Sequence, residues 1–254
     1  MSFFSNMKFT PEKYKEASVL AREVGEEMIA RLEWMTLKPR VIVDLGCGTG
    51  DLSARLQAHY KEAQVIGIDL SEAMINHARQ NNTQLSCVCA NAASLPFADQ
   101  SVDLLFANLM FPWVQDISSL LKECHRVLRT DGLLMFSALG PDTFKEWQNV
   151  FESGDLPFLI DMHDAGDLLL KHNLADPILD VNYYTLSYRD QSQLLDELLI
   201  TGMLSKLPDE SANNTLEVTY EVVIAHAFAG ELKQTSEDGI TRIPLSHLRK
   251  QLRS

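Results

Sequence analysis

The feature that most constrains the fold is a glycine-rich turn between an apolar strand and a helix, in the stretch VIVDLGCGTGDLS at 41–53. Its hydrophobic pattern predicts a buried strand over 41–45 and a helix that begins just after the turn. A strand, a glycine-rich turn and a helix in this order are typical of proteins that bind a nucleotide-like ligand at the edge of a parallel sheet. The stretch therefore predicts an α/β fold with such a ligand at the turn.

The spacing of the glycines narrows the class of ligand. Dinucleotide-binding turns have the pattern Gly-x-Gly-x-x-Gly, and here Asp51 or Ser53 stands where the third glycine is needed. The chain instead has one acid and three glycines at alternate positions: Asp44, Gly46, Gly48 and Gly50. Alternate glycines let the backbone lie flat against a ligand. An acid just before them suits an amino group better than it suits a pyrophosphate.

A second acid, Asp69, ends the next predicted strand, 63–70, and stands 19 residues beyond Gly50. A carboxylate at this place can accept hydrogen bonds from both hydroxyls of a ribose. Asp44 would then face the amino-acid end of the ligand, and Asp69 its nucleoside end. S-adenosylmethionine is a nucleoside with an amino-acid tail, and it is the predicted cofactor.

Further cofactor contacts are expected where the next strands end, because open α/β sheets bind ligands at that edge. Asn91 would accept from the adenine amino group, and the Ala92 N–H would donate to the adenine ring. Asn108 and Leu109 would lie near the sulfonium, although a turn-forming role for Asn108 is the alternative. The predicted cofactor contacts are Asp44, Gly46, Cys47, Gly48, Gly50, Asp69, Leu70, Met74, Asn91, Ala92, Asn108 and Leu109.

Strands and helices alternate beyond the turn, which predicts a Rossmann-like, mostly parallel sheet of seven strands with helices on both faces and an antiparallel edge strand. The strands after 41–45 are expected at 63–70, 84–90, 102–109, 132–139, 176–188 and 216–229. A single helix is expected over 11–34, and another over 117–128. We predict one domain over 1–254: a leading helical segment (1–38), a cofactor-binding core (39–140), and substrate-side helices with the last two strands and a basic tail (141–254).

A net charge of −13 over 254 residues argues against nucleic-acid binding, which depends on Lys and Arg. Apolar stretches are shorter than the roughly 18 residues of a membrane span, and the first ten residues do not resemble a secretory signal. The four cysteines fit neither a zinc spacing nor a disulfide framework. The acidic stretch around His163 is interpreted as a helix start rather than a metal site. We therefore expect a cytoplasmic protein with no membrane or nucleic-acid partner and no metal.

These residues together resemble the class I S-adenosylmethionine-dependent methyltransferases over roughly 40–140. Within that class, the chain is similar to the malonyl-[acyl-carrier protein] O-methyltransferases of biotin synthesis. The similar stretches are ANLMFPWVQD (107–116), LGPDTFKEW (139–147), DMHDAGDLLLKHNLADPILD (161–180), TLSYRD (185–190) and TYEVVIAHAF (219–228). The leading helix also matches, with Tyr14 and Arg22 in register. Three features differ from that family: Lys15, Ala21 and a short segment at 203–220.

The resemblance implies methyl transfer to the carboxylate of a malonyl group on an acyl carrier protein, with S-adenosylhomocysteine as product. A carboxylate is already ionised at neutral pH, so the reaction needs alignment rather than a general base. Arg189 is the candidate cation for that carboxylate, and Tyr14 a candidate lid or hydrogen-bond donor; a solvated surface position and helix packing are the alternatives. Trp113 would form a wall of the substrate pocket, with plain core packing as the alternative. No catalytic residue beyond these positioning candidates and no oligomeric state is predicted.

Other functions remain open at this point. The acceptor could be another small acid or a protein, or the chain could be a hydroxylase, as in a mitochondrial complex I assembly factor that resembles it in the leading helix. A cofactor-binding assembly factor without methyl transfer is the non-enzymatic alternative. An acidic carrier protein should dock on a basic surface, which the tail at 241–254 would supply, unless this tail is simply solvated.

Overall fold

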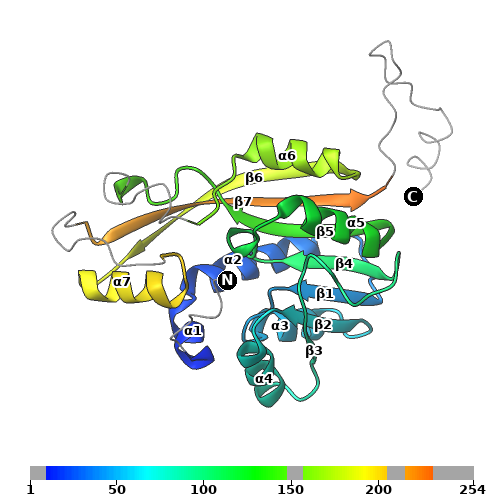
Figure 1. Ribbon diagram of the computed structural model, residues 1–254, viewed down its shortest axis with the longest axis horizontal. Coiled ribbons are helices and arrows are strands. Elements are labelled where there is room, and N and C mark those ends of the chain that lie inside the picture. The colour runs from blue at the N-terminus through cyan, green and yellow to red at the C-terminus, as the bar shows by residue number, and fades with distance from the viewer. Residues whose placement is uncertain (1–9, 148–156, 205–214, 231–254) are drawn as a thin grey trace, which may run out of the picture.

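The computed structural model describes residues 10–147, 157–204 and 215–230, and its strands form a seven-stranded sheet in the order β3-β2-β1-β4-β5-β7-β6 (Figure 1). The strands are β1 (Val41–Leu45), β2 (Gln64–Asp69), β3 (Ser86–Cys89), β4 (Val102–Ala107), β5 (Leu128–Leu139), β6 (Leu174–Ser187) and β7 (Glu217–Ala229). The α-helices are α1 (Pro11–Ala17), α2 (Val19–Glu33), α3 (Asp51–His59), α4 (Glu72–Asn81), α5 (Ile117–Val127), α6 (Met162–Lys171) and α7 (Gln191–Ile200). Two short 3-10 helices are η2 (Phe111–Trp113) and η3 (Lys145–Trp147).

The parallel part of the sheet places β1 at its centre, with Val43 paired to Ile66 of β2 on one side and to Leu105 of β4 on the other. The expected mostly parallel sheet with an antiparallel pairing at one edge is confirmed. The antiparallel strand is β7, which lies between β5 and the edge strand β6 and pairs antiparallel with both. Because β7 follows β6 along the chain, the two long strands pair as neighbours of opposite direction.

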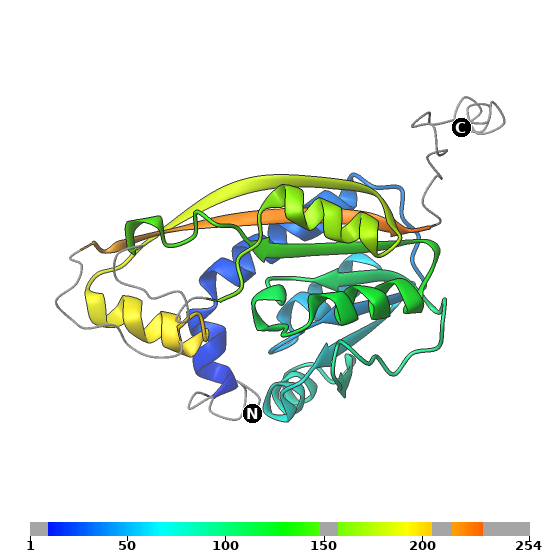
Figure 2. The ribbon, with the colours of Figure 1, turned by 45° about the horizontal axis from the view of Figure 1, so that its top comes forward.

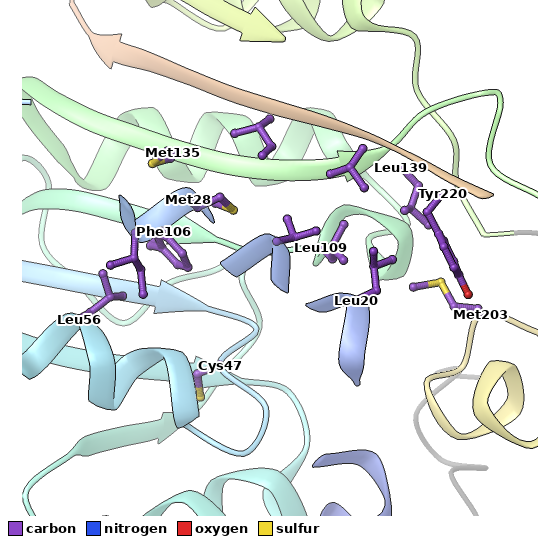
Figure 3. Close-up of a cluster of buried hydrophobic side chains, with 14 of the residues drawn as sticks. Leu20, Met28, Cys47, Leu56, Phe106, Leu109, Met135, Leu139, Met203 and Tyr220 are labelled. Atoms are coloured by element: carbon purple, nitrogen blue, oxygen red, sulfur yellow. The ribbon is translucent and has the colours of Figure 1, made fainter. Parts of the chain in front are cut away.

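Helices cover both faces of the sheet, as predicted. The helices α2, α3, α4 and α7 contribute buried side chains to a core on one face, and α5 and α6 contribute to the core on the other. Figure 3 shows the first of these cores, in which Leu20 of α2, Leu109 after β4 and Tyr220 of β7 all take part. Figure 2 shows α1 and α7 beside each other at one end of the molecule. This is the end toward which the glycine turn projects.

The expectation of one continuous leading helix is wrong. The chain leaves helical geometry at Ser18 (φ −81°, ψ 50°), which separates α1 from α2. The Ser18 hydroxyl donates back to the Lys15 carbonyl, a local bond that competes with the regular helical ladder. The break lets α1 turn toward α4, where Glu12 accepts from the His77 ring at 3.0 Å. The break thus brings α1 over the glycine turn.

Helix α5 and the strand after it also differ from expectation. The helix ends at Val127, and β5 begins at once with Leu128, which is buried and pairs with Val102. The strand then bulges, with Asp131 at a positive φ, before it resumes its parallel register with β4. The predicted boundary near 132 therefore marks the bulge and not the start of the strand.

The expected single domain over 1–254 stays a prediction. Its basic tail at 241–254 and most of the short segment at 203–220 lie outside the described residues. Within the ranges that the structure describes, no helix is long and apolar enough to cross a bilayer. Asp161 caps the N-terminus of α6 by accepting from the His163 N–H, which confirms the interpretation of this acidic stretch as a helix start.

Candidate functional site

Two cavities adjoin the carboxyl edge of the parallel strands. The first has a volume of about 570 Å³ and extends from the end of β2 past β4 to the turn after α7. The second has a volume of about 350 Å³ and lies between the glycine turn and the helices α1 and α2. Four residues line both cavities: Tyr14, Gly46, Gly48 and Asn108. Both volumes are within the range of small-molecule sites.

The glycine turn between β1 and α3 is held by β2 and by close packing. The N–H groups of Gly46 and Cys47 both donate to the Ile68 carbonyl, at 2.8 and 2.9 Å. All three glycines of the turn have positive φ: 73° at Gly46, 51° at Gly48 and 82° at Gly50. A Cβ on Gly46 would lie 2.8 Å from the Met110 side chain. The glycines are therefore needed for the backbone path and for the close approach of neighbouring side chains.

Asp69 lies at the end of β2 and lines the first cavity. Its carboxylate accepts from the N–H groups of Gly48, at 2.9 Å, and Ser71, at 2.8 Å. Burial raises the pKa of Asp69, while these backbone donors lower it. The two donors fix the orientation of the carboxylate, and each oxygen can accept a further hydrogen bond. The contact of Asp69 with a ribose stays a prediction.

Asp44 is the penultimate residue of β1 and lines the second cavity. Only 2% of the residue is exposed, and its carboxylate accepts a short hydrogen bond from the Ser53 hydroxyl. Burial raises the pKa of Asp44 to about 7, and the nearby charge of Asp69 adds to the rise. A buried carboxylate with a single hydroxyl donor is costly to ionise, and a cationic ligand beside it would offset that cost.

Asn108 follows β4 and ties three elements together. Its side-chain N–H donates to the Ala21 carbonyl of α2 at 2.6 Å, and its oxygen accepts from Ser137 of β5 at 2.9 Å. Ser137 in turn accepts from the Leu109 N–H, at 2.8 Å, and Leu109 has a positive φ. Asn108 therefore links α2 and β5 by tertiary hydrogen bonds, a structural role different from the turn-forming one given as the alternative, and it lines both cavities.

The other predicted cofactor contacts divide by position. Leu70, Met74, Asn91, Ala92 and Leu109 line the first cavity. Cys47 lines the second, where its thiol lies over Gly67. Gly50 is not among the described residues that line either cavity, and it contributes by turning the chain into α3.

Tyr14 of α1 lies where the two cavities meet. The ring carbon Cε1 would lie 3.6 Å from a Cβ on Gly48, so the phenol ring covers the turn. Burial, with a further contribution from the charge of Asp69, raises the pKa of Tyr14 to about 12. The phenol is therefore neutral at physiological pH and keeps a proton to donate. A role of Tyr14 as a lid or hydrogen-bond donor stays a prediction.

The two other substrate candidates lie in different places. Trp113 of η2 lines the first cavity and also packs against the core, so its role as a wall of the substrate pocket stays a prediction. Arg189 is exposed at the start of the loop before α7, and as described it lines neither cavity. Its backbone N–H donates to Gln193 at 3.1 Å. The structure does not bring Arg189 together with the other predicted residues.

Several lining residues were not among the predicted contacts. Arg22 of α2 lines the second cavity and has a long ionic contact of 3.9 Å with Glu23, whereas Lys15 pairs with Asp51 at 2.6 Å. The one sequence feature that pointed to Arg22 was its match, in register, to the leading helix of the similar family. Four residues of the first cavity lie at breaks in the hydrophobic pattern, so the periodicity of the sequence did not indicate them: Pro112, Phe158, Gly202 and Met203. No cluster of three or more metal-ligating side chains occurs in the part of the chain that the structure describes.

Comparison with known proteins decides the family. Residues 43–136 match the model of a methyltransferase domain. The malonyl-[acyl-carrier protein] O-methyltransferase of Gallionella capsiferriformans (strain ES-2) is 36% identical, over 85% of this chain and 86% of that protein. The chain belongs to the malonyl-[acyl-carrier protein] O-methyltransferase family. The resemblance inferred from the sequence motifs is thereby confirmed, and the protein is a methyltransferase.

Solved structures agree at the level of the fold. The YcgJ protein of Bacillus subtilis has a TM-score of 0.62 at 16% identity, over 81% of this chain and 99% of that chain. An S-adenosylmethionine-dependent methyltransferase of Thermotoga maritima, described as a possible histamine N-methyltransferase, has a TM-score of 0.57 at 19% identity, over 86% of this chain and 95% of that chain. The Rossmann-like class I methyltransferase fold of this family member is thereby confirmed.

Proposed function

We propose that the protein transfers the methyl group of S-adenosylmethionine to the free carboxylate of malonyl-[acyl-carrier protein], an early step of biotin synthesis. The observation that carries the proposal is the pair of cavities that meet at Gly46 and Gly48, each lined by an acid: the half-buried Asp69 and the buried Asp44. Asp69 faces the first cavity and Asp44 the second. Such an arrangement suits a ligand that has a ribose on one side and a cationic amino group on the other.

The residues present fit this cofactor by their chemistry. Asp69 would hold the ribose hydroxyls, with Asn91 and Ala92 near the adenine. Asp44 would face the ammonium group, which offsets the cost of its buried charge. Arg22, which lines the same second cavity, would hold the carboxylate of the amino-acid end.

S-adenosylmethionine, when bound, supplies a methyl group on a sulfonium, and the task left to the chain is to align the acceptor with it. Tyr14 lies where the two cavities meet, and its neutral phenol can donate a hydrogen bond to the acceptor carboxylate. Trp113, Phe158 and Met203 line the far side of the first cavity with apolar surface and exclude water. The acceptor carboxylate needs no general base, because it is ionised at neutral pH.

The location of Arg189 favours a second candidate, which is a methyltransferase of the same class whose acceptor is another small acid or a protein. Arg189, the predicted cation for the acceptor carboxylate, lies outside both cavities. It could therefore not contact an acceptor carboxylate bound inside either cavity in this arrangement. The retained acids Asp44 and Asp69 count against a role as an assembly factor without a cofactor-dependent activity. The acceptor therefore has to be identified by assay.

The test is methyl transfer from labelled S-adenosylmethionine to malonyl-[acyl-carrier protein]. We expect base-labile label on the carrier with the wild type and at least a hundredfold less with Asp69→Asn. Asp167→Asn, which replaces an exposed acid on α6, is the matched control and should label like the wild type. Cofactor binding without label on the carrier would refute the malonyl assignment and leave the second candidate. Absence of cofactor binding would refute both.

A further inference from the structure

One part of the wall of the first cavity is built where two segments that are distant in the sequence touch. Trp113 of η2 and Gly202, just after α7, both line this cavity. A Cβ on Gly202 would lie 2.9 Å from Cη2 and 3.2 Å from Cζ3 of the Trp113 indole. The edge of the indole therefore lies directly against the backbone of Gly202, where any larger residue would collide with it.

Gly202 is fixed in place by the end of α7. The helix buries Leu194, Leu195 and Leu198 in the core. The Gly202 N–H donates to the Leu199 carbonyl at 3.1 Å, and φ at Gly202 is 74°, so the residue ends the helix in the left-handed conformation that favours glycine.

A second set of contacts anchors the same helix end to the sheet. Tyr188 directly follows β6, and its hydroxyl donates to the Glu197 carboxylate at 3.0 Å. The Thr201 hydroxyl donates to the Glu197 carbonyl at 2.8 Å, and Leu204 N–H donates to Leu198 at 3.0 Å. Met203 lies beside the buried ring of Tyr220 (Figure 3). These contacts fix the position of Gly202 relative to β6 and β7.

The opposite side of the contact is η2, a single turn of three residues, whose Trp113 side chain is half-buried and packs against the core. An added side chain at 202 would collide with this indole. Since both residues line the cavity, either the displaced indole or the added side chain narrows the acceptor end.

We propose that Gly202 is a specificity determinant: through its contact with Trp113 it sets the width of the acceptor end, which admits a slender, unbranched malonyl thioester and disfavours one branched beside the carboxylate. This inference rests on the proposed function, and it names a feature of the acceptor that the function alone leaves open. Apolar pockets discriminate a single added carbon by roughly 10- to 200-fold in kcat/KM.

The experiment compares malonyl and methylmalonyl thioesters of the carrier protein as acceptors. We expect the wild type to prefer the malonyl thioester at least tenfold, and Trp113→Leu to reduce that preference severalfold. Gly202→Ala should raise KM for the malonyl thioester about tenfold, while kcat and the Kd of S-adenosylmethionine stay within twofold. In Gly202→Ala/Trp113→Leu the rise in KM should largely disappear, because the colliding ring is gone.

Two control variants separate the effect of pocket width on KM from the effect of backbone strain. Gly202→Asn keeps a residue that tolerates positive φ and should raise KM as Gly202→Ala does. Gly166→Ala of α6, where a Cβ would make an ordinary 3.6 Å contact, should behave like the wild type. If either thioester is methylated but the substitutions at 202 leave KM and selectivity unchanged, or their effects add to those of Trp113→Leu, the inference is overturned. If the wild type methylates neither thioester, the proposed function falls, and the inference falls with it.

Discussion

The buried carboxylate of Asp44 makes opposite demands on stability and on cofactor binding, and Asp44→Asn should separate the two. In the folded chain the pKa of Asp44 is raised to about 7 from 3.8. Between these pH values the folded state holds a proton that the unfolded state releases. The contribution of Asp44 to stability is therefore largest below the unfolded pKa and falls as the pH rises toward 7.

The shift corresponds to a destabilisation of about 4 kcal/mol at pH 8, since each pKa unit is about 1.4 kcal/mol. Asn removes the charge, but its amide N–H groups need acceptors that the buried site only partly supplies. We expect the cofactor-free variant to be about 2 kcal/mol more stable than the wild type at pH 8, and no more stable at pH 5. The measurement is urea unfolding of both proteins at each pH.

The same substitution should weaken the binding of S-adenosylmethionine by at least tenfold, because the ammonium group loses its anionic neighbour. Wild-type affinity should fall as the pH drops below 7, by up to tenfold per unit, because binding then has to expel a proton from Asp44. Isothermal titration in two buffers of different ionisation enthalpy detects that proton. Asp167→Asn, at an exposed position on α6, is the control and should bind S-adenosylmethionine like the wild type. A D44N variant that is no more stable than the wild type at pH 8 would refute the reasoning.

Four further substitutions test the site. Asn108→Ala removes the bonds to Ala21 and Ser137, so urea unfolding should show a loss of roughly 1–3 kcal/mol in the free energy of unfolding. Arg22→Gln should raise the Kd of S-adenosylmethionine about tenfold. Arg189→Gln should leave both this Kd and the KM of the acceptor within twofold of the wild-type values. A large rise in the acceptor KM of Arg189→Gln would show that Arg189 contributes to the acceptor site. Tyr14→Phe should lower kcat at least tenfold with the cofactor Kd within threefold, and an unchanged kcat in steady-state assays would contradict the proposed role of the phenol.

Local sequence determined the part of this protein that we propose binds the cofactor. The apolar strand at 41–45, the alternate glycines and Asp69 at the end of the next strand each act within a short stretch, and their spacing restricts the backbone whatever surrounds it. The fold class follows from the same kind of signal, because alternating strand and helix patterns leave few arrangements other than a mostly parallel sheet. The family membership follows from these motifs together.

Only the tertiary structure showed which residues come together at the proposed acceptor end. Gly202 and Trp113 stand 89 residues apart in the sequence, and nothing in either stretch indicates that they touch. Asn108 looked like a turn residue or a cofactor contact, and its bonds to Ala21 and Ser137 exist only because α2 lies across the end of β4. Arg189 has the right charge beside a family-like motif, yet it lies outside both cavities. Periodicity and glycine spacing encode the path of the backbone, whereas the meeting of distant side chains depends on how whole elements pack.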